Sequence, residues 1–261
     1  MNIALISLDQ SWENKQANKE KISNIFENIS GEKLDWIILP ELTLTGFSMN
    51  TKDLAEDFDN SETIIFFSEL SIKYKVYITF GLIIKSDSYA TNNLITTDRI
   101  GNIIMFYEKI HPFSYSGENK FYKSGSRISL AIIDKIKVGF SICYDLRFPE
   151  IFQIMSKDVL VLVNIANWPE KRIVHWNVLL QARAIENQCF MIGVNRVGID
   201  GNNIKYPKSS AIFNPIGEKL NSIKSYPEVD IYKVDFEEVI TIRDSFPTKQ
   251  DRKLEFYKLF Y

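Results

Sequence analysis

The sequence predicts an α/β fold, and two observations support this prediction. Apolar runs typical of buried strands alternate along the chain with segments whose apolar residues recur at helical spacing. Several strands also follow one another across short turns, so that βα units and hairpins occur in one chain. Because helices and sheets each have an apolar face to bury, this mixture favours packed layers with the sheets inside and the helices outside.

The beginning of the chain contains both patterns. Residues 1–10 alternate as a first strand does, and the run at 34–40 is typical of a buried strand. The helix predicted between them is marked by apolar residues at three- and four-residue steps, namely Ile22, Ile25, Phe26 and Ile29. Gly31 stands where the C-terminal cap of that helix is expected. A second helix is predicted to begin near Ser61 and to turn three apolar side chains inward, Phe66, Phe67 and Leu70.

The rest of the chain continues without a linker or an internal repeat, which predicts a single domain over residues 1–261. Three strands and then a further hairpin are predicted, at 76–85, 89–97, 102–109, 127–134 and 135–143, with a turn at 98–101. Helix and strand then alternate over 150–155, 158–164, 175–188 and 189–196. The aromatic-rich tail from about residue 247 is predicted either to cross to a partner subunit or to close the core of its own chain.

Composition excludes several classes of protein. The 31 Lys and Arg residues balance 33 Asp and Glu residues, and this charge balance argues against a nucleic-acid partner. No apolar run reaches the roughly 18 residues that a membrane span needs, and the N-terminal run is too short for a signal peptide. Two cysteines do not make a disulfide framework, so we expect a cytoplasmic protein.

Three reactive side chains stand at the exits of predicted strands. Glu41 and Lys109 each come at the end of an apolar run, and Cys143 ends another run before residues that suit the start of a helix. Because open α/β folds place their sites at such an edge, we expect the three to meet. A cysteine nucleophile needs a base. The two histidines, His111 and His175, have plausible structural positions beside Pro112 and Trp176, which leaves open whether another residue is the base.

The stretches around these residues resemble the nitrilase superfamily of carbon–nitrogen hydrolases. "LPELTLTGF", "YEKIHPF" and "ICYDLRFPE" occur in that order, and the resemblance extends from Met1 to about Pro247. It implies a four-layer αββα sandwich, usually dimerised through the sandwich, so we expect a homodimer. It also implies a Glu-Lys-Cys triad. Each residue alone has an ordinary structural explanation, such as a helix cap or a buried core thiol, but the three motifs together outweigh it.

The resemblance also implies the role of each site residue. Glu41 is the general base, Cys143 the nucleophile, and Lys109 the group that stabilises the tetrahedral intermediate. The second glutamate of the family matches Glu118, and we assign the other oxyanion donor to the N–H of Tyr144. A helix start at the cysteine is expected to favour its thiolate form.

The segment 166–202 resembles the ω-amidase branch, whose members hydrolyse the side-chain amide of 2-oxoglutaramate and 2-oxosuccinamate. The matching pieces are "NWP", "ARAIENQ" and "NRVGIDGN". A substrate of this kind requires a group that holds its carboxylate, for which Arg172 is our candidate, with Trp168 and Phe113 as apolar walls. The alternative for Arg172 is a surface charge that follows a turn.

One departure from that branch affects a loop near the predicted mouth of the site. Pro207 and Lys208 stand where a small residue or glycine is expected, which puts the fine substrate preference in doubt rather than the reaction class. Another small-amide amidase or an N-carbamoyl hydrolase is therefore the alternative function, ahead of a true nitrilase. A noncatalytic scaffold would be marked by a lost triad residue, and all three are present.

The remaining candidates are predicted to be structural. Cys189 is predicted to be an inert core thiol, whereas Asp145, Arg147 and Glu150 are predicted to brace the turn after Cys143 by ion pairing. The sequence has no Cys/His cluster with zinc spacing and no glycine-rich phosphate loop, so we assign neither a metal nor a cofactor.

Overall fold

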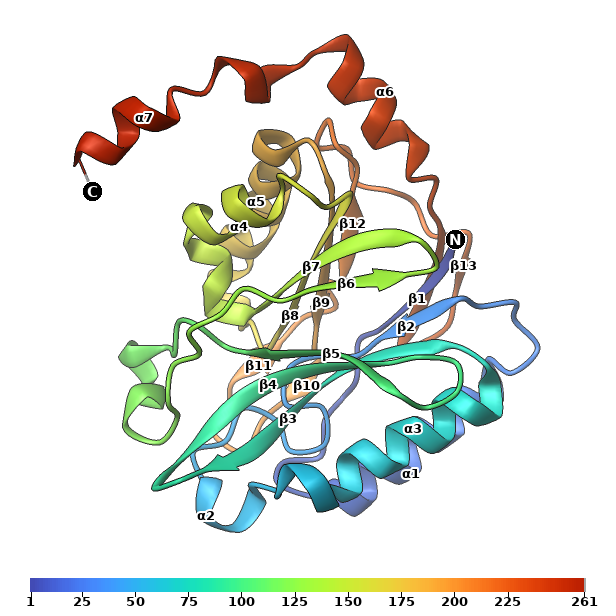
Figure 1. Ribbon diagram of the computed structural model, residues 1–261. Helices are drawn as coiled ribbons and strands as arrows, with labels where there is room; N and C mark the ends of the chain where they lie inside the picture. Colours follow the sequence, from blue (N-terminus) through green and yellow to red (C-terminus); the bar gives the residue numbers. More distant parts are fainter. Residues whose placement is uncertain (261) are drawn as a thin grey trace.

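The fold is a pair of β-sheets packed face to face between two layers of helices (Figure 1). The structure is a computed structural model and describes residues 1–260. Helices α1 (Lys15–Asn28) and α3 (Glu62–Tyr74) cover the outer face of one sheet. Helices α4 (Pro149–Met155) and α5 (Ile173–Asn187) cover the outer face of the other. This is the four-layer αββα sandwich that the resemblance implied.

The first sheet has seven strands in the order β13-β14-β1-β2-β3-β4-β5. In chain order they are β1 (Asn2–Ile6), β2 (Trp36–Ile38), β3 (Tyr77–Ser86), β4 (Tyr89–Thr97), β5 (Ile103–Glu108), β13 (Lys224–Ser225) and β14 (Val229–Lys233). Strands β1, β2 and β3 are parallel, and β3, β4 and β5 form an antiparallel meander. The predicted turn at residues 98–101 joins β4 to β5, which confirms it.

The second sheet has five strands in the order β12-β9-β8-β7-β6. They are β6 (Leu130–Ile133), β7 (Ile136–Ile142), β8 (Val161–Ala166), β9 (Phe190–Asn195) and β12 (Ala211–Phe213). The three central strands are parallel and almost wholly buried, as parallel strands covered on both faces must be. A separate two-stranded ribbon, β10 (Gly198–Ile199) with β11 (Lys205–Tyr206), follows β9.

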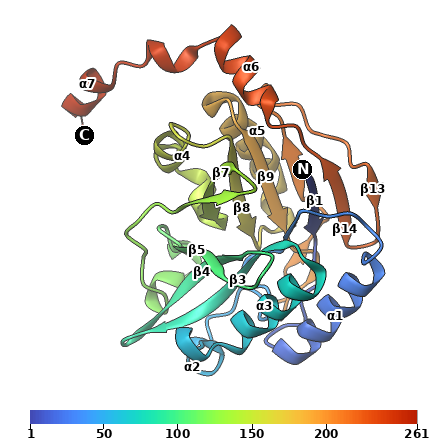
Figure 2. The same ribbon diagram turned by 45° about the vertical axis from the view of Figure 1, so that its right-hand side comes forward.

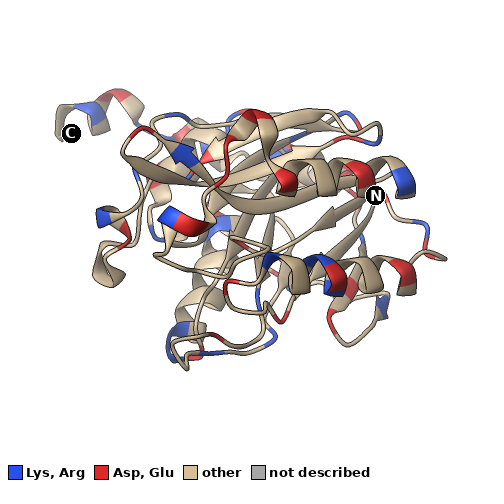
Figure 3. Ribbon diagram, turned by 90° about the horizontal axis from the view of Figure 1, so that it is seen from below, with Lys and Arg blue, Asp and Glu red and all other residues tan. Residues whose placement is uncertain are grey.

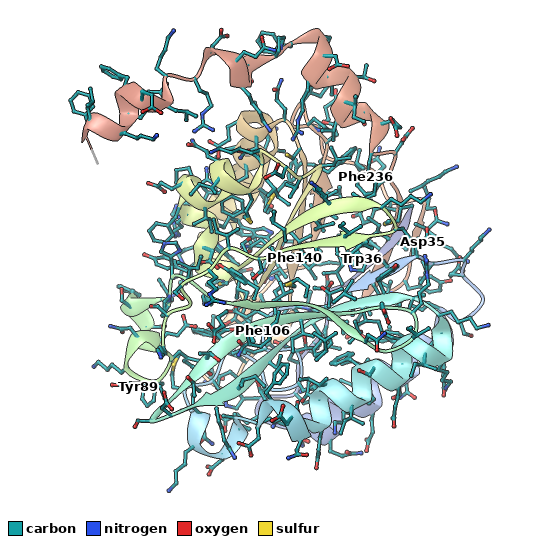
Figure 4. The ribbon with its side chains drawn as sticks, viewed as in Figure 1. Asp35, Trp36, Tyr89, Phe106, Phe140 and Phe236 are labelled. Atoms are coloured by element: carbon teal, nitrogen blue, oxygen red, sulfur yellow. The ribbon has the colours of Figure 1, made fainter. Side chains whose placement is uncertain are left out.

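Aromatic side chains fill the space between the layers. Trp36 of the first sheet and Phe140 of the second meet edge to face with ring centroids 6.4 Å apart, and Figure 4 shows both between the sheets. Under the outer helices, Phe67 stacks on Phe80 at 4.1 Å. Phe66, which was also predicted to point inward, is only half-buried.

The ends of the two outer helices test the cap predictions. Helix α3 begins next to Ser61, as predicted, and the Ser61 hydroxyl caps it by accepting the N–H of Ile64 at 3.1 Å. The prediction for Gly31 is wrong. Helix α1 ends at Asn28 and its C-cap is Ile29, because the N–H of Ile29 already reaches the carbonyl of the preceding turn.

After α6 (Glu237–Ser245) the C-terminal segment contacts the body of the molecule up to Arg252, whose Nη2 donates to Oε1 of Gln153 at 2.6 Å. Helix α7 (Leu254–Tyr257) lies apart from the sandwich in both views (Figures 1 and 2). The side chains of Phe256 and Leu259 are 57% and 76% exposed. This tail therefore does not close the core of its own chain, which leaves a partner subunit as the other prediction.

The surface carries both signs of charge. Figure 3 shows basic and acidic residues interspersed along the helices and loops, in line with the balanced composition. Between residues 1 and 260, no helix is both long enough and apolar enough to span a bilayer.

Candidate active site

Three strand ends bring the predicted triad together. Glu41 follows β2, Lys109 directly follows β5 of the same sheet, and Cys143 directly follows β7 of the facing sheet. The ammonium of Lys109 lies 2.9 Å from Oε1 of Glu41. Asn167, whose N–H donates to Oε2 of Glu41 at 2.9 Å, lines the same cavity as Cys143, so the thiol is close to this pair. The site therefore lies at one edge of the sandwich, between its two sheets.

Lys109 sits between two buried carboxylates. Its Nζ is 2.9 Å from Oε2 of Glu118, and Glu41, Lys109 and Glu118 are all shielded from solvent. The amide of Asn92 on β4 donates to both carboxylates, at 2.8 Å to Glu41 and 3.0 Å to Glu118. The structure thus places Glu118 beside the triad, as the looser motif match predicted.

The ionisation of this cluster follows from burial and from its own charges. Burial alone would lower the pKa of Lys109, but the charges of Glu118 and Glu41 outweigh burial and raise that pKa well above its ordinary value. Burial, together with the charge of Glu41, raises the pKa of Glu118 above its ordinary value against the opposing effect of Lys109. Lys109 is therefore a fixed positive charge that the two acids share.

A second amide orients the predicted base. The backbone N–H of Asn167 donates to Oε2 of Glu41 at 2.9 Å, and its side-chain amide donates to the Glu41 carbonyl at 2.7 Å. One carboxylate oxygen of Glu41 thus faces Lys109 and Asn92, and the other faces Asn167. Neither asparagine was predicted from the sequence, although both contact Glu41 directly.

Cys143 sits at a strained turn. Its φ is +47°, a left-handed conformation that costs a non-glycine residue on the order of 1 kcal/mol or more. The chain then forms a single 3-10 turn, Cys143–Arg147, before α4 begins at Pro149. A helical segment therefore begins at the cysteine, as predicted, but it is a 3-10 turn, and the α-helix follows six residues later.

The protonation state of Cys143 also differs from the expectation. Burial, and then the negative charge of Glu41, raise the pKa of the Cys143 thiol well above its ordinary value, and Lys109 only partly offsets them. The expectation that the turn favours the thiolate is wrong for the resting site. The thiol is neutral and stands beside a carboxylate that can accept its proton.

A cavity of about 550 Å³ opens onto the thiol. The four predicted binding residues all line it, and they are Phe113, Tyr144, Trp168 and Arg172. The guanidinium of Arg172 lies 5.2 Å from the centre of the Phe113 ring, and the Trp168 indole N–H donates to the Arg172 carbonyl at 2.7 Å. Arg172 therefore faces the cavity and is not the surface charge of the alternative interpretation.

The prediction that Arg147 braces the turn after Cys143 is wrong. The arginine lines the cavity and does not brace the turn by ion pairing, since it makes no salt bridge within residues 1–260. Its guanidinium lies 5.0 Å from the centre of the Trp168 ring, and Nη2 is 3.2 Å from Nδ1 of His175. His175 is exposed and contacts this arginine, so it has no buried structural role. Glu150 is also exposed.

Other polar residues at the cavity had no sequence prediction. Glu13 and Asp200 line it, and the Ser48 hydroxyl donates to Glu13. The departure at Pro207 and Lys208 does not reach the cavity wall, because Lys208 Nζ turns away to Oδ2 of Asp230, 3.0 Å distant.

The second cysteine stands apart from the site. Cys189 is fully buried, and its sulfur lies 2.8 Å from Nη2 of Arg243, away from the cavity. Over the part of the chain that the structure describes, no group of three or more His, Cys, Asp or Glu side chains is arranged to hold a metal ion.

Comparisons with known proteins identify the family to which this chain belongs. The profile of the carbon–nitrogen hydrolase family matches residues 2–244. The chain therefore belongs to this family, which is the nitrilase superfamily.

Individual members of the family are similar to this chain over almost its whole length. The chain is similar to a 2-oxoglutaramate amidase of Bacillus subtilis, at 31% identity over 98% of both chains. It is also 29% identical to a hydrolase in the agr operon of Staphylococcus aureus, over 99% of this chain and 100% of that protein. Among solved structures, a carbon–nitrogen hydrolase superfamily protein of Xanthomonas campestris with an arsenic adduct in its active site superposes with a TM-score of 0.90. It is 28% identical, over 97% of each chain.

Proposed function

We propose that this protein is an ω-amidase-type hydrolase, which converts 2-oxoglutaramate or 2-oxosuccinamate and water to the oxo-dicarboxylic acid and ammonia. The observation that carries the proposal is one cavity that holds Cys143 together with two guanidinium groups, those of Arg147 and Arg172. The charges of the buried pair, Glu41 and Lys109, both affect the pKa of the same thiol. The cavity thus offers a nucleophile for an amide and positive charge for a carboxylate.

The first half of the reaction forms a thioester. Glu41 takes the proton of the Cys143 thiol, and the sulfur attacks the amide carbon. The oxygen of the tetrahedral intermediate gains negative charge, which Lys109 and the N–H of Tyr144 stabilise. When the C–N bond breaks, Glu41 returns its proton to the leaving nitrogen, and ammonia departs.

The second half hydrolyses the thioester. Glu41 is again a carboxylate, so it can take a proton from a water molecule as the oxygen attacks the thioester carbon. The same two donors stabilise the second oxyanion. The C–S bond then breaks, the proton returns to sulfur, and the carboxylic acid leaves. Glu118 keeps the ammonium of Lys109 in place throughout, because its carboxylate is 2.9 Å from that nitrogen.

The substrate class rests on the two guanidinium groups of the cavity, which also contains the side chains of Glu13 and Asp200. Two planar guanidinium groups suit a carboxylate, which an arginine can bind through two parallel hydrogen bonds. Phe113 and Trp168 lie under these groups and limit their movement. The similarity to a 2-oxoglutaramate amidase supports the same substrate.

The test is ammonia release from 2-oxoglutaramate by the purified protein. We expect Cys143→Ala to abolish release, whereas Cys189→Ala, which removes the other buried thiol, retains it. Release that depends on Cys143 from N-carbamoyl compounds or another small amide, but not from 2-oxoglutaramate, would replace the substrate and keep the reaction class. Absence of any turnover that depends on Cys143 would contradict the proposed function and favour a noncatalytic scaffold.

We also propose that the protein is a cytoplasmic homodimer. Exposed apolar residues on the outer face of α5 support an interface, and they are Val174, Val178 and Ile185, exposed by 68%, 56% and 49%. The tail beyond residue 247 carries further exposed apolar groups that a second subunit could cover.

A further inference from the structure

The side chain of Asp145 contacts the strand that ends at the nucleophile. It is fully buried, and its Oδ2 accepts the backbone N–H of Ile142 at 2.9 Å. Ile142 is the last residue of β7 and directly precedes Cys143. The carboxylate therefore holds the chain at the point where it enters the left-handed conformation of Cys143.

The same carboxylate contacts the strand end that carries Lys109. The Tyr107 hydroxyl donates to Oδ2 at 2.7 Å, and the backbone N–H of His111 donates to Oδ1 at 3.0 Å. Nδ1 of His111 is a further 2.8 Å partner of Oδ1. Tyr107 and His111 flank Lys109 by two residues on either side, so the segment is held on both sides of the lysine.

These contacts join the two sheets at the site. Strand β5 belongs to the seven-stranded sheet and β7 to the five-stranded sheet. Burial and the charge of Asp145 raise the pKa of Tyr107 well above its ordinary value, so its hydroxyl stays protonated and donates. The His111 ring also stacks on Phe148, just beyond the turn, with centroids 3.8 Å apart.

We propose that Asp145 is a positioning residue that fixes the distance between the Cys143 sulfur and the Lys109 ammonium. This inference rests on the proposed roles of those two residues but not on the identity of the amide. Asp145 does not line the cavity, so we expect it to act on the reaction without contacting the substrate. Asp145 fixes the positions of the attacking sulfur and of the groups that donate to the oxyanion. A displacement of about 1 Å in these positions can cost on the order of a hundredfold in rate.

The test compares kcat and KM in variants that change one partner at a time. Asp145→Asn keeps the shape but places an NH₂ donor among groups that are themselves donors. We expect kcat to fall on the order of a hundredfold while KM changes by less than about threefold. Tyr107→Phe and His111→Leu each remove one donor and are expected to lower kcat by about tenfold. His111→Asn, which retains a side-chain donor, is expected to restore part of the loss.

A matched substitution separates positioning from stability. Tyr226→Phe also removes a tyrosine hydroxyl from a carboxylate, that of Glu32 at 2.6 Å, but at a surface away from the cavity. It is expected to leave kcat unchanged. The double variant of Asp145→Asn and Tyr107→Phe is expected to lose no more than Asp145→Asn alone, because both act through one carboxylate. If kcat in Tyr107→Phe and in His111→Leu is as high as in Tyr226→Phe, the inference is wrong.

A second readout needs no substrate. The rate at which iodoacetamide alkylates Cys143 is measured by peptide mass spectrometry, with the buried Cys189 as internal reference. We expect at least about tenfold slower alkylation in Tyr107→Phe, because the displaced thiol loses its base. An unchanged rate would overturn the inference. If the wild-type protein hydrolyses no amide, the proposed function fails, but the alkylation rates still decide the role of Asp145.

Discussion

The ammonium of Lys109 lies 2.9 Å from Oε1 of Glu41, and less than 2% of either side chain is exposed. A second buried carboxylate, that of Glu118, is equally close. Burial of three charged groups is costly, and only their mutual pairing and the donors around them offset that cost. The cluster is therefore explained better by the chemistry at Cys143 than by a need for stability.

Removal of the Lys109 ammonium should destabilise the whole protein as well as disturb the site. Lys109→Met leaves two carboxylates buried without their cation, and loss of one partner of a buried pair typically costs about 3–5 kcal/mol. We expect a decrease of this size in the free energy of unfolding, measured by urea denaturation. Lys85→Met is the control. It removes an exposed 3.0 Å pair with Asp57 and should cost less than about 1 kcal/mol. Equal losses in the two variants would contradict this account of the cluster.

The raised pKa of Glu118 predicts how stability depends on pH. Between the ordinary value of 4.5 and the raised value, the folded protein binds more protons at this carboxyl than the unfolded chain does. The contribution of Glu118 to stability is therefore greatest at low pH and decreases as pH rises through that interval.

Glu118→Gln removes this dependence. We expect the free energy of unfolding of the wild type, relative to the variant, to decrease with rising pH by at most about 1.4 kcal/mol per pH unit. Urea denaturation from about pH 4 upward measures it, and the trend should persist at about 0.5 M salt because buried charges are poorly screened. A pH-independent difference would show that Glu118 does not titrate in this way.

The sequence reveals much of this site because its ionisable residues stand where apolar strand patterns stop. Glu41, Lys109 and Cys143 all follow this rule, and the two facing sheets bring these strand exits to one edge. Asn167 also follows a buried strand, but an amide carries no charge or nucleophile that singles it out. Asn92 lies inside β4, where nothing in the strand pattern distinguishes it from its neighbours.

Features that depend on packing could not be predicted. An arginine four residues after Cys143 can pair with a nearby acid or face the cavity, and the rings of Trp168 and Tyr144 determine that Arg147 does the latter. The state of the Cys143 thiol depends on burial and on the sum of three neighbouring charges. The predicted helix start at Cys143 carries no information about these three charges, which come from distant parts of the sequence.

The two guanidinium groups predict how substrate affinity changes. Arg172→Ala and Arg147→Ala should each raise KM for 2-oxoglutaramate about tenfold to a hundredfold, because a hydrogen bond to a charged group is worth about 1.5–3 kcal/mol. KM for butyramide, which has no carboxylate, should change far less. Steady-state ammonia release measures both. Arg147→Lys keeps the charge but loses the planar fork, so it should restore only part of the affinity. Equal effects on both amides would mean that these arginines do not bind the carboxylate.

The exposed tail predicts a dependence of assembly on its apolar side chains. Phe256, Leu259 and Phe260 are 57%, 76% and 72% exposed on this chain, and burial of each would be worth about 1.5–3 kcal/mol. We expect the full chain to be a dimer by size-exclusion chromatography with light scattering. A chain that ends at Phe246 should dissociate at higher concentration than the full chain. A full-length triple variant with serine at the three tail positions should weaken the dimer similarly, since it removes the apolar contacts but keeps the backbone. A monomeric full-length protein would refute the proposed assembly, and a dimer unaffected by either change would place its interface on α5 alone.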